Sequence, residues 1–444
     1  MKPTRSILLF ILLFSMAFSH RTSGQTSTIP FRINPDDSIT LPDILKQVIA
    51  TYPTVLRAEA AIASADAGIG LARSAYYPNI EADAGYTRLG PISQIDLPFG
   101  SFQIYPANNY NLTLNIAQTI YDFSKTSRAV NLEKSNKEIV EKNVELIRQR
   151  LTLQTSVCYY SLVYLQEAKK IKDAQIDNLK KHLEFIRKKE ETGSSTEYEV
   201  LSTKVRLSNT ENSKVDLETA CKTQQALLSA LLGLPAETEL KVRNTLNLRS
   251  GVAGTDSLIN YALQHRYEMI LAKLKEEHAA LHLRSVKAQN FPALNAYATG
   301  GWKNGYLPDL NKLTGNYAAG VGLKVPVFDA TRRKNTIGLV NAEINITKQE
   351  TATITREIST EVYQNQTSLN ASLTKIKQNE LQVEQAEQAY DLASTSFKAG
   401  VITNLDLLDS ETALEESRVN LLKARTDYAI NQVRLSVSLG KALY

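Results

Sequence analysis

The chain has 444 residues, with 51 Lys and Arg against 46 Asp and Glu and a formal net charge of +5. This near balance gives no basic surface for nucleic acid. After the N-terminal leader, no segment approaches the roughly 18 consecutive apolar residues of a transmembrane helix. Cys158 and Cys221 lie inside predicted helices about 10 Å out of register along the axis, which excludes a disulfide.

Residues 1–24 read as a secretory signal peptide. Lys2 and Arg5 form its charged region, Ile7 to Phe18 form its apolar region, and small residues up to Gly24 offer cleavage sites. The alternative, a membrane anchor, requires a longer apolar stretch. Removing Lys2, Arg5 and Arg21 from the 51 basic residues leaves 48 against 46 acidic ones, so we expect a nearly neutral mature chain.

The rest of the chain is an internal duplication. Equivalent residues lie 207 positions apart: Asp122 and Asp329, Gly193 and Gly400, Thr196 and Thr403, Gly233 and Gly440. Before this block the spacing is 214, so the second copy is seven residues shorter in a segment that we expect to be a loop. We expect repeats over 38–234 and 256–443, with an irregular connector over 235–255.

Each repeat begins with a predicted helix, over 41–75 and 257–289, followed by two alternating segments. Residues 80–88 and 109–116 form the predicted hairpin 79–120, and residues 294–303 and 317–325 form the hairpin 293–328. Segments of about ten residues, polar on one face and apolar on the other, are typical of outer-membrane barrel strands. A half-buried soluble hairpin is the alternative for any single segment.

Four strands cannot close a barrel, and an open sheet edge is not tolerated in lipid. Membrane-spanning strands therefore require several chains to share one barrel. Aromatic residues near the expected strand ends suit the membrane interface; they are Tyr86, Tyr105, Tyr110, Tyr297, Trp302, Tyr306 and Tyr317.

Long helices are predicted over 124–192 and 331–399, where glycine and proline are almost absent. Each is about 100 Å long and needs partners along its whole length. Two adjoining heptad seams, one through Ile139 and Leu146 and one through Val140 and Ile147, indicate a neighbour on each side.

A tight turn ends each long helix. Gly193 and Gly400 suit a left-handed C-terminal turn, and Thr196 and Thr403 begin capping boxes. The return helices are predicted over 196–233 and 403–440.

This order of elements resembles the TolC-type outer-membrane efflux proteins over nearly the whole mature chain, from about Ser38 to Leu443. The match lies in a helix, a proline before a strand hairpin, an Asp-led long helix, a Gly-to-Thr turn and a Leu-Gly end, each present twice. The resemblance implies a mainly helical fold with transmembrane β-strands, in which three chains share a twelve-stranded barrel continued by a coiled-coil helical barrel across the periplasm.

The resemblance also implies a passive outer-membrane export channel without enzymatic activity or cofactor. Such a homotrimer works in a tripartite system with a periplasmic membrane-fusion adaptor and an inner-membrane pump. The alternatives are the exit duct of a type I protein secretion system and, in another class, a secreted or periplasmic coiled-coil scaffold. The adaptor would contact the turns, at Gly193, Thr196, Glu199, Gly400, Thr403 and Asp406.

Two charged groups are further candidates. Acidic residues near the turns would form rings at the tube entrance or an ordinary solvated stripe; they are Asp173, Asp177, Glu184, Glu380, Glu384, Glu387 and Asp391. In the family a tyrosine–arginine–aspartate network closes this end. That network is not assigned here, because this stretch lacks an arginine; Tyr390 and Asp391 are the nearest candidates.

Arg332, Arg333 and Lys334 begin a helix, where the dipole disfavours positive charge, so contact with lipid phosphates is predicted. Three exposed residues without a partner are the alternative. His278 and His282 have the spacing of metal ligands but no evident third ligand, so no metal site is predicted.

Overall fold

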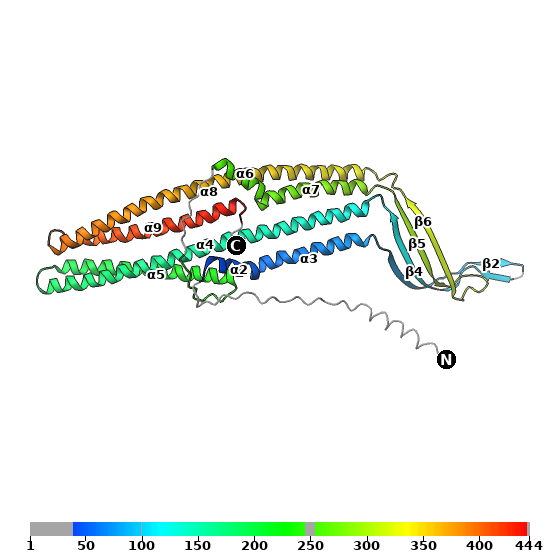
Figure 1. The fold of residues 1–444 in the computed structure, drawn as a ribbon. Helices are drawn as coiled ribbons and strands as arrows, with labels where there is room; N and C mark the ends of the chain where they lie inside the picture. The colour runs from blue at the N-terminus through cyan, green and yellow to red at the C-terminus, as the bar shows by residue number, and fades with distance from the viewer. Residues whose placement is uncertain (1–38, 99, 245–253, 442–444) are drawn as a thin grey trace, which may run out of the picture. The chain divides into compact units, whose positions relative to one another are not determined.

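The computed structural model describes residues 39–98, 100–244 and 254–441. Its elements repeat in order (Figure 1), with helices of 11, 22, 67 and 36 residues in the first repeat and 11, 22, 67 and 35 in the second. The first set is α2 (Leu41–Thr51), α3 (Pro53–Ser74), α4 (Lys125–Glu191) and α5 (Glu197–Leu232), and the second is α6 (Thr255–His265), α7 (Tyr267–Ala288), α8 (Arg332–Lys398) and α9 (Asn404–Ser438). The leader 1–24 and most of the connector, 245–253, lie outside the described residues.

The first predicted helix of each repeat is in fact two helices. α2 and α3 are separated by Tyr52, and α6 and α7 by Arg266, both with extended backbone. In the first repeat the break follows from Pro53, which disfavours a helical conformation at the residue before it. The second repeat has no proline there, and its break is stabilised by the contacts of Arg266.

The predicted strands form one antiparallel sheet of order β1-β4-β5-β6. Its strands are β1 (Asn79–Arg88), β4 (Asn108–Tyr121), β5 (Ala293–Lys303) and β6 (Thr314–Lys324). Tyr86 on β1 pairs with Tyr110 on β4. Thr113 on β4 pairs with Gly301 on β5, where the strands of the two repeats meet. The sheet joins both repeats and leaves β1 and β6 as its edges among the described residues.

A short second hairpin was not predicted. It pairs β2 (Gln94–Leu97) with β3 (Gly100–Gln103) between β1 and β4. Strands of four residues are too short to show a period of two above chance, so the pattern gave no signal.

Helix α4 packs along α3 and α7 toward the sheet and along α5 and α9 toward the turn, while α8 packs along α7 and α9 (Figure 1). The neighbours on two sides that its adjoining seams indicated are thus present. The largest core lies where α2, α4 and α5 meet, around Tyr159, Leu162 and Leu228. Cys158 packs at this core, and both cysteines are free.

No helix in the described part of the chain is sufficiently long and apolar to cross a membrane.

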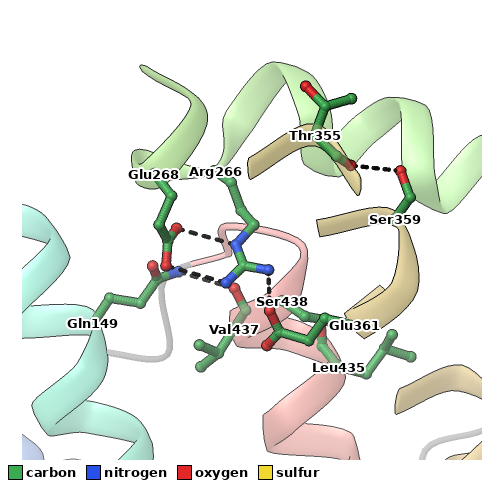
Figure 2. Close-up of polar contacts among 9 residues, drawn as sticks. All are labelled: Gln149, Arg266, Glu268, Thr355, Ser359, Glu361, Leu435, Val437 and Ser438. Atoms are coloured by element: carbon green, nitrogen blue, oxygen red, sulfur yellow. Dashed lines mark hydrogen bonds and ion pairs between the residues drawn. The ribbon is translucent and has the colours of Figure 1, made fainter. Parts of the chain in front are cut away.

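Arg266 joins the break between α6 and α7 to helix α8 (Figure 2). Its guanidinium donates to both carboxylate oxygens of Glu268, at 3.0 and 3.1 Å, and to Glu361 on α8. Beside it, Gln149 of α4 donates to the carbonyl oxygen of Val437 at 3.1 Å, near the end of α9. Arg266 is only 7% exposed, so its charge depends on these two carboxylates.

Candidate functional site: the helical turns and the contacts between them

The first turn closes α4 through Gly193, whose φ is +72°. The amide of Gly193 donates to Glu190 at 2.8 Å and that of Ser194 donates to Lys189 at 2.7 Å, so two terminal carbonyl groups are satisfied. Thr196 then caps α5, since its hydroxyl accepts from the Glu199 amide at 3.3 Å.

The second turn repeats this arrangement. Gly400 has φ +76°, and the Val401 amide donates to Ser396 at 2.9 Å. Thr403 and Asp406 cap α9 reciprocally, through a hydroxyl that accepts at 3.2 Å and a carboxylate that accepts at 2.9 Å. Both predicted capping boxes are present. We call α4–α5 the first hairpin and α8–α9 the second.

A buried amide links the two hairpins. Asn404, the first residue of α9, is 1% exposed. Its oxygen lies 2.6 Å from Nε2 of His182 on α4, and its nitrogen donates at 3.1 Å to the hydroxyl of Thr203 on α5. Burial lowers the pKa of His182, which keeps the imidazole neutral and able to donate from Nε2. The Asn404 nitrogen also donates to the carbonyl oxygen of Glu199 at 3.4 Å, so one side chain of the second hairpin bonds to three polar groups of the first.

An apolar cluster surrounds this link. It contains residues from all four helices: Leu183, Ile186, Val200, Phe397 and Leu407. The Lys189 ammonium lies 4.9 Å from the ring centroid of Phe397, adding a cation–π contact between the hairpins.

A second polar contact between the hairpins is more exposed. Arg206 on α5 pairs with Asp409 on α9 at 2.6 Å, and the Asp409 side chain is 62% exposed. Solvent screening makes this pair weaker than the buried Asn404 link.

The structure supplies arginines to the predicted acidic stripe. They come from α9 rather than from the stripe itself: Glu380 pairs with Arg425 at 3.0 Å, and Glu387 pairs with Arg418 at 2.9 Å. In the first hairpin Asp173 pairs with Lys214 at 2.6 Å, and Glu184 pairs with Lys188 at 3.1 Å.

Much of the stripe is therefore charge-compensated. Glu384 and Asp391 are exposed, and no ion pair involves either of them within the described residues. Asp177 lies near Lys214 and contributes to the raised pKa of that lysine, for which the hydrogen bond to Asp173 is the largest cause.

Two buried carboxylates were missed by sequence reasoning. Glu411 and Glu415 lie one turn apart on α9 and are 5% and 3% exposed. Arg418 donates to one oxygen of Glu415 at 3.0 Å, while the other oxygen of Glu415 and Oε1 of Glu411 are buried without a hydrogen-bond partner in the described part of the chain. The available signal was their position in the apolar stripe of α9, which includes Leu407, Leu408 and Leu414.

These carboxylates have altered acidity. Burial raises the pKa of Glu411 to about 7, and the neighbouring charge of Glu415 adds to the rise while Arg206 opposes it. Burial also raises the pKa of Glu415, against the influence of Arg418. The pKa of Tyr390 on α8 is raised by burial and by the charges of Glu411, Asp391 and Glu415.

Three basic residues, Arg332, Arg333 and Lys334, begin α8 and are exposed. The backbone amide of Arg333 donates to the Asp329 carboxylate at 3.0 Å, so Asp329 caps this end of α8. Asp122 does the same for Thr126 at 2.7 Å in the first repeat. No ion pair of Arg332, Arg333 or Lys334 is present among the described residues, which leaves the predicted lipid contact a prediction.

His282 lies 3.3 Å from Glu343 on α8. In the described ranges no group of three or more His, Cys, Asp or Glu residues is arranged to hold a metal ion.

The family model described as outer membrane efflux protein matches residues 44–234 and 258–441, one segment for each repeat. The chain belongs to this family. It is accordingly an outer-membrane efflux channel that extends into the periplasm, and its mixed helical and β architecture is the TolC-like fold that the sequence predicted.

Several efflux-family relatives are similar to the chain over most of its length. The outer membrane protein TolC of Vibrio cholerae is 21% identical and covers 90% of both chains. The alkaline protease secretion protein AprF of Pseudomonas aeruginosa is 23% identical, covering 75% of this chain and 70% of its own. The crystal structure of VceC from Vibrio cholerae superposes with a TM-score of 0.74 at 20% identity, covering 91% of this chain and 97% of VceC. Channels of the efflux family are trimeric and work with adaptor and pump partners.

Proposed function

We propose that three copies of this chain form the outer-membrane duct of a tripartite efflux system. The sheet supports a barrel shared between copies, because β1 and β6 expose backbone groups that a membrane cannot solvate. Pairing β6 of one copy with β1 of the next closes a barrel. Apolar side chains on β6 suit lipid, with Tyr317 90% exposed and Val321 68% exposed in the single chain.

The two turns are the proposed docking surface for a periplasmic adaptor. Their polar residues are engaged in capping, so the side chains free to contact a partner are apolar neighbours such as Tyr198 and Val401. Gly193, Thr196, Glu199, Gly400, Thr403 and Asp406 hold the shape of this surface.

Opening of the duct would separate the second hairpin from the first. The observation that carries this proposal is the Asn404 link, in which one buried side chain of the second hairpin bonds to His182 and Thr203 of the first. Docking at the turns would act on the helix ends that bear this link and the Arg206–Asp409 pair. The pump, rather than the duct, supplies the energy.

The charged groups have proposed roles in this duct. Glu384 and Asp391 would favour cations at the entrance, since their charges are not compensated by ion pairs within the described residues. Arg332, Arg333 and Lys334 follow β6 and would bind lipid phosphates beside the barrel.

Detergent-extracted protein tests the stoichiometry. Light scattering should give the mass of three copies, and a monomer would contradict the shared barrel. V401D tests docking: we expect it to conduct normally in planar bilayers while efflux from cells is lost. Normal efflux by V401D would contradict docking at this turn.

Protein secretion is a second candidate function, favoured by the similarity to AprF. Deleting the gene and comparing the deletion strain with its parent separates the two functions, if both the secreted proteins and the small molecules accumulated in the cells are measured. Loss of one secreted protein without accumulation of small molecules would favour secretion.

A further inference from the structure

Glu411 and Glu415 form a polar layer within the apolar packing of α9. On one side lies the cluster that includes Leu407, and on the other lies the cluster around Ala424 and Tyr428. Both carboxylates are buried although α9 is a long helix with ample exposed surface for charge. Burying a carboxylate without full hydrogen bonding costs free energy, so this layer weakens the contact it occupies whenever it is ionised.

Charged groups face the layer from every helix packed on this part of α9. Arg206 reaches toward Glu411 from α5, but its guanidinium is already bound to Asp409. Lys172 of α4 influences Glu415 while donating to the amide oxygen of Gln175 at 2.7 Å. The remaining titratable neighbours are Tyr390, Asp391 and Glu387 on α8 and Arg418 on α9 itself.

The cations do not compensate both carboxylates. Arg418 is shared between Glu387 and Glu415, and Glu411 forms no ion pair within the described residues. Two carboxylates one helical turn apart also repel each other when both are charged. The packed arrangement therefore favours at least one proton in the layer.

We propose that Glu411 and Glu415 make the packing of the second hairpin against the first depend on pH. Protonated carboxyls allow α9 to pack on α4 and α5, and ionised carboxylates favour separation, in which water solvates them. The inference rests on the proposed function only in linking hairpin separation to channel opening.

The direction follows from proton linkage. The pKa of Glu411 is about 7 when packed, above the ordinary value of 4.5 that a solvated carboxyl would have. Below that ordinary value both states hold the proton, and the packed state carries no penalty. Between 4.5 and about 7 the separated state has lost the proton while the packed state keeps it, so packing weakens as pH rises by up to about tenfold per pH unit. Above about 7 the response levels off.

Spin-label distances test the coupling without requiring channel activity. Nitroxides at S208C on α5 and A413C on α9, both exposed positions, report the separation of the hairpins in full-length protein with Cys158 and Cys221 replaced. Between about pH 5 and about pH 7.5, we expect the separated population to rise tenfold or more. E411Q/E415Q, a near-isosteric permanently neutral layer, should remove this rise.

Two further variants make the result specific. E416Q removes one exposed carboxylate next to the layer and should respond as the wild type does. E411Q alone should remove most of the response, because Glu415 keeps Arg418. A full response in E411Q/E415Q, or a wild-type distance that does not change with pH, would overturn the proposal.

Conductance in planar bilayers, recorded over the same pH range, separates this inference from the proposed function. A pH-dependent distance with unchanged conductance would support the proton-controlled layer and contradict opening by hairpin separation. A parallel change in both would support the two together.

Discussion

Gly440 closes α9 directly against the carbonyl group of His265, the last residue of α6. A Cβ atom at Gly440 would lie 2.6 Å from that oxygen. Gly233 occupies the equivalent position of the first repeat with nearly the same backbone, φ +72° against +76°, but a Cβ there would meet open space. Both glycines are therefore required for their positive φ, but only Gly440 is also required because no space is left for a Cβ atom.

We expect G440A to destabilise the protein more than G233A. Both substitutions place a side chain at positive φ, at a cost of about 1–2 kcal/mol. Only G440A adds a clash with backbone, so its midpoint in chemical denaturation should fall further. Equal shifts for the two variants would show that the α9 end moves freely away from α6.

The Asn404 link and the Arg206–Asp409 pair should differ in their effect on opening. N404A removes the acceptor of the half-buried His182 imidazole and one of two partners of the Thr203 hydroxyl, at about 1–3 kcal/mol, whereas D409N weakens an exposed pair worth about 0.2–1 kcal/mol. N404A should therefore raise the open fraction in planar bilayers by about fivefold to a hundredfold or more, and D409N by less than about fivefold. A larger effect of D409N would show that the exposed pair controls the gate.

Arg418 and Arg425 form a matched pair for a third test. Each binds a glutamate of α8, but only Arg418 also binds the buried Glu415. R425Q should cost less than about 1 kcal/mol of unfolding free energy, and R418Q should cost more because it leaves Glu415 without its cation.

The R418Q penalty should also depend on pH. Arg418 lowers the pKa of Glu415 against burial, so its loss raises that pKa further. A protonated Glu415 does not need the arginine, so the penalty should be small at acidic pH. It should grow as the pH rises from the pKa of Glu415 in the wild type to its higher pKa in R418Q. Denaturation of both variants at several pH values checks this, and a penalty independent of pH would contradict it.

These ion pairs show what the sequence could predict. Glu380 and Glu387 are seven residues apart, as are Arg418 and Arg425, and both pairs are centred between Ile402 and Thr403. Once the turn that follows Gly400 is recognised, equal distance from its centre between Ile402 and Thr403 identifies the partners. The first hairpin has the same pair with charges reversed, Lys180 with Glu211 at 3.6 Å. The long helices, the turns and the strands of the main sheet were likewise predicted from local sequence patterns that occur once in each repeat.

Other contacts depend on which helix faces pack. The break at Arg266 has no local breaker, and its partner Glu361 is 95 residues away. Glu411 is buried on the face of α9 that also carries Leu407 and Leu408, so its burial depends on the helices packed there. Sequence periodicity gives the face of a helix but not the neighbour it meets, so these residues were missed.

Arg266 should be essential to stability through charge rather than shape. R266M leaves the carboxylates of Glu268 and Glu361 without their cation, and we expect a loss of about 2–4 kcal/mol. This is toward the low end for a broken buried pair because the Glu361 side chain is 44% exposed. Adding E268Q and E361Q to R266M should recover most of the loss, since no uncompensated charge then remains. R150Q, at an exposed position of α4, should change unfolding free energy by no more than about 0.5 kcal/mol. If the triple variant is no more stable than R266M, packing of the arginine side chain, and not its charge, holds the break between α6 and α7.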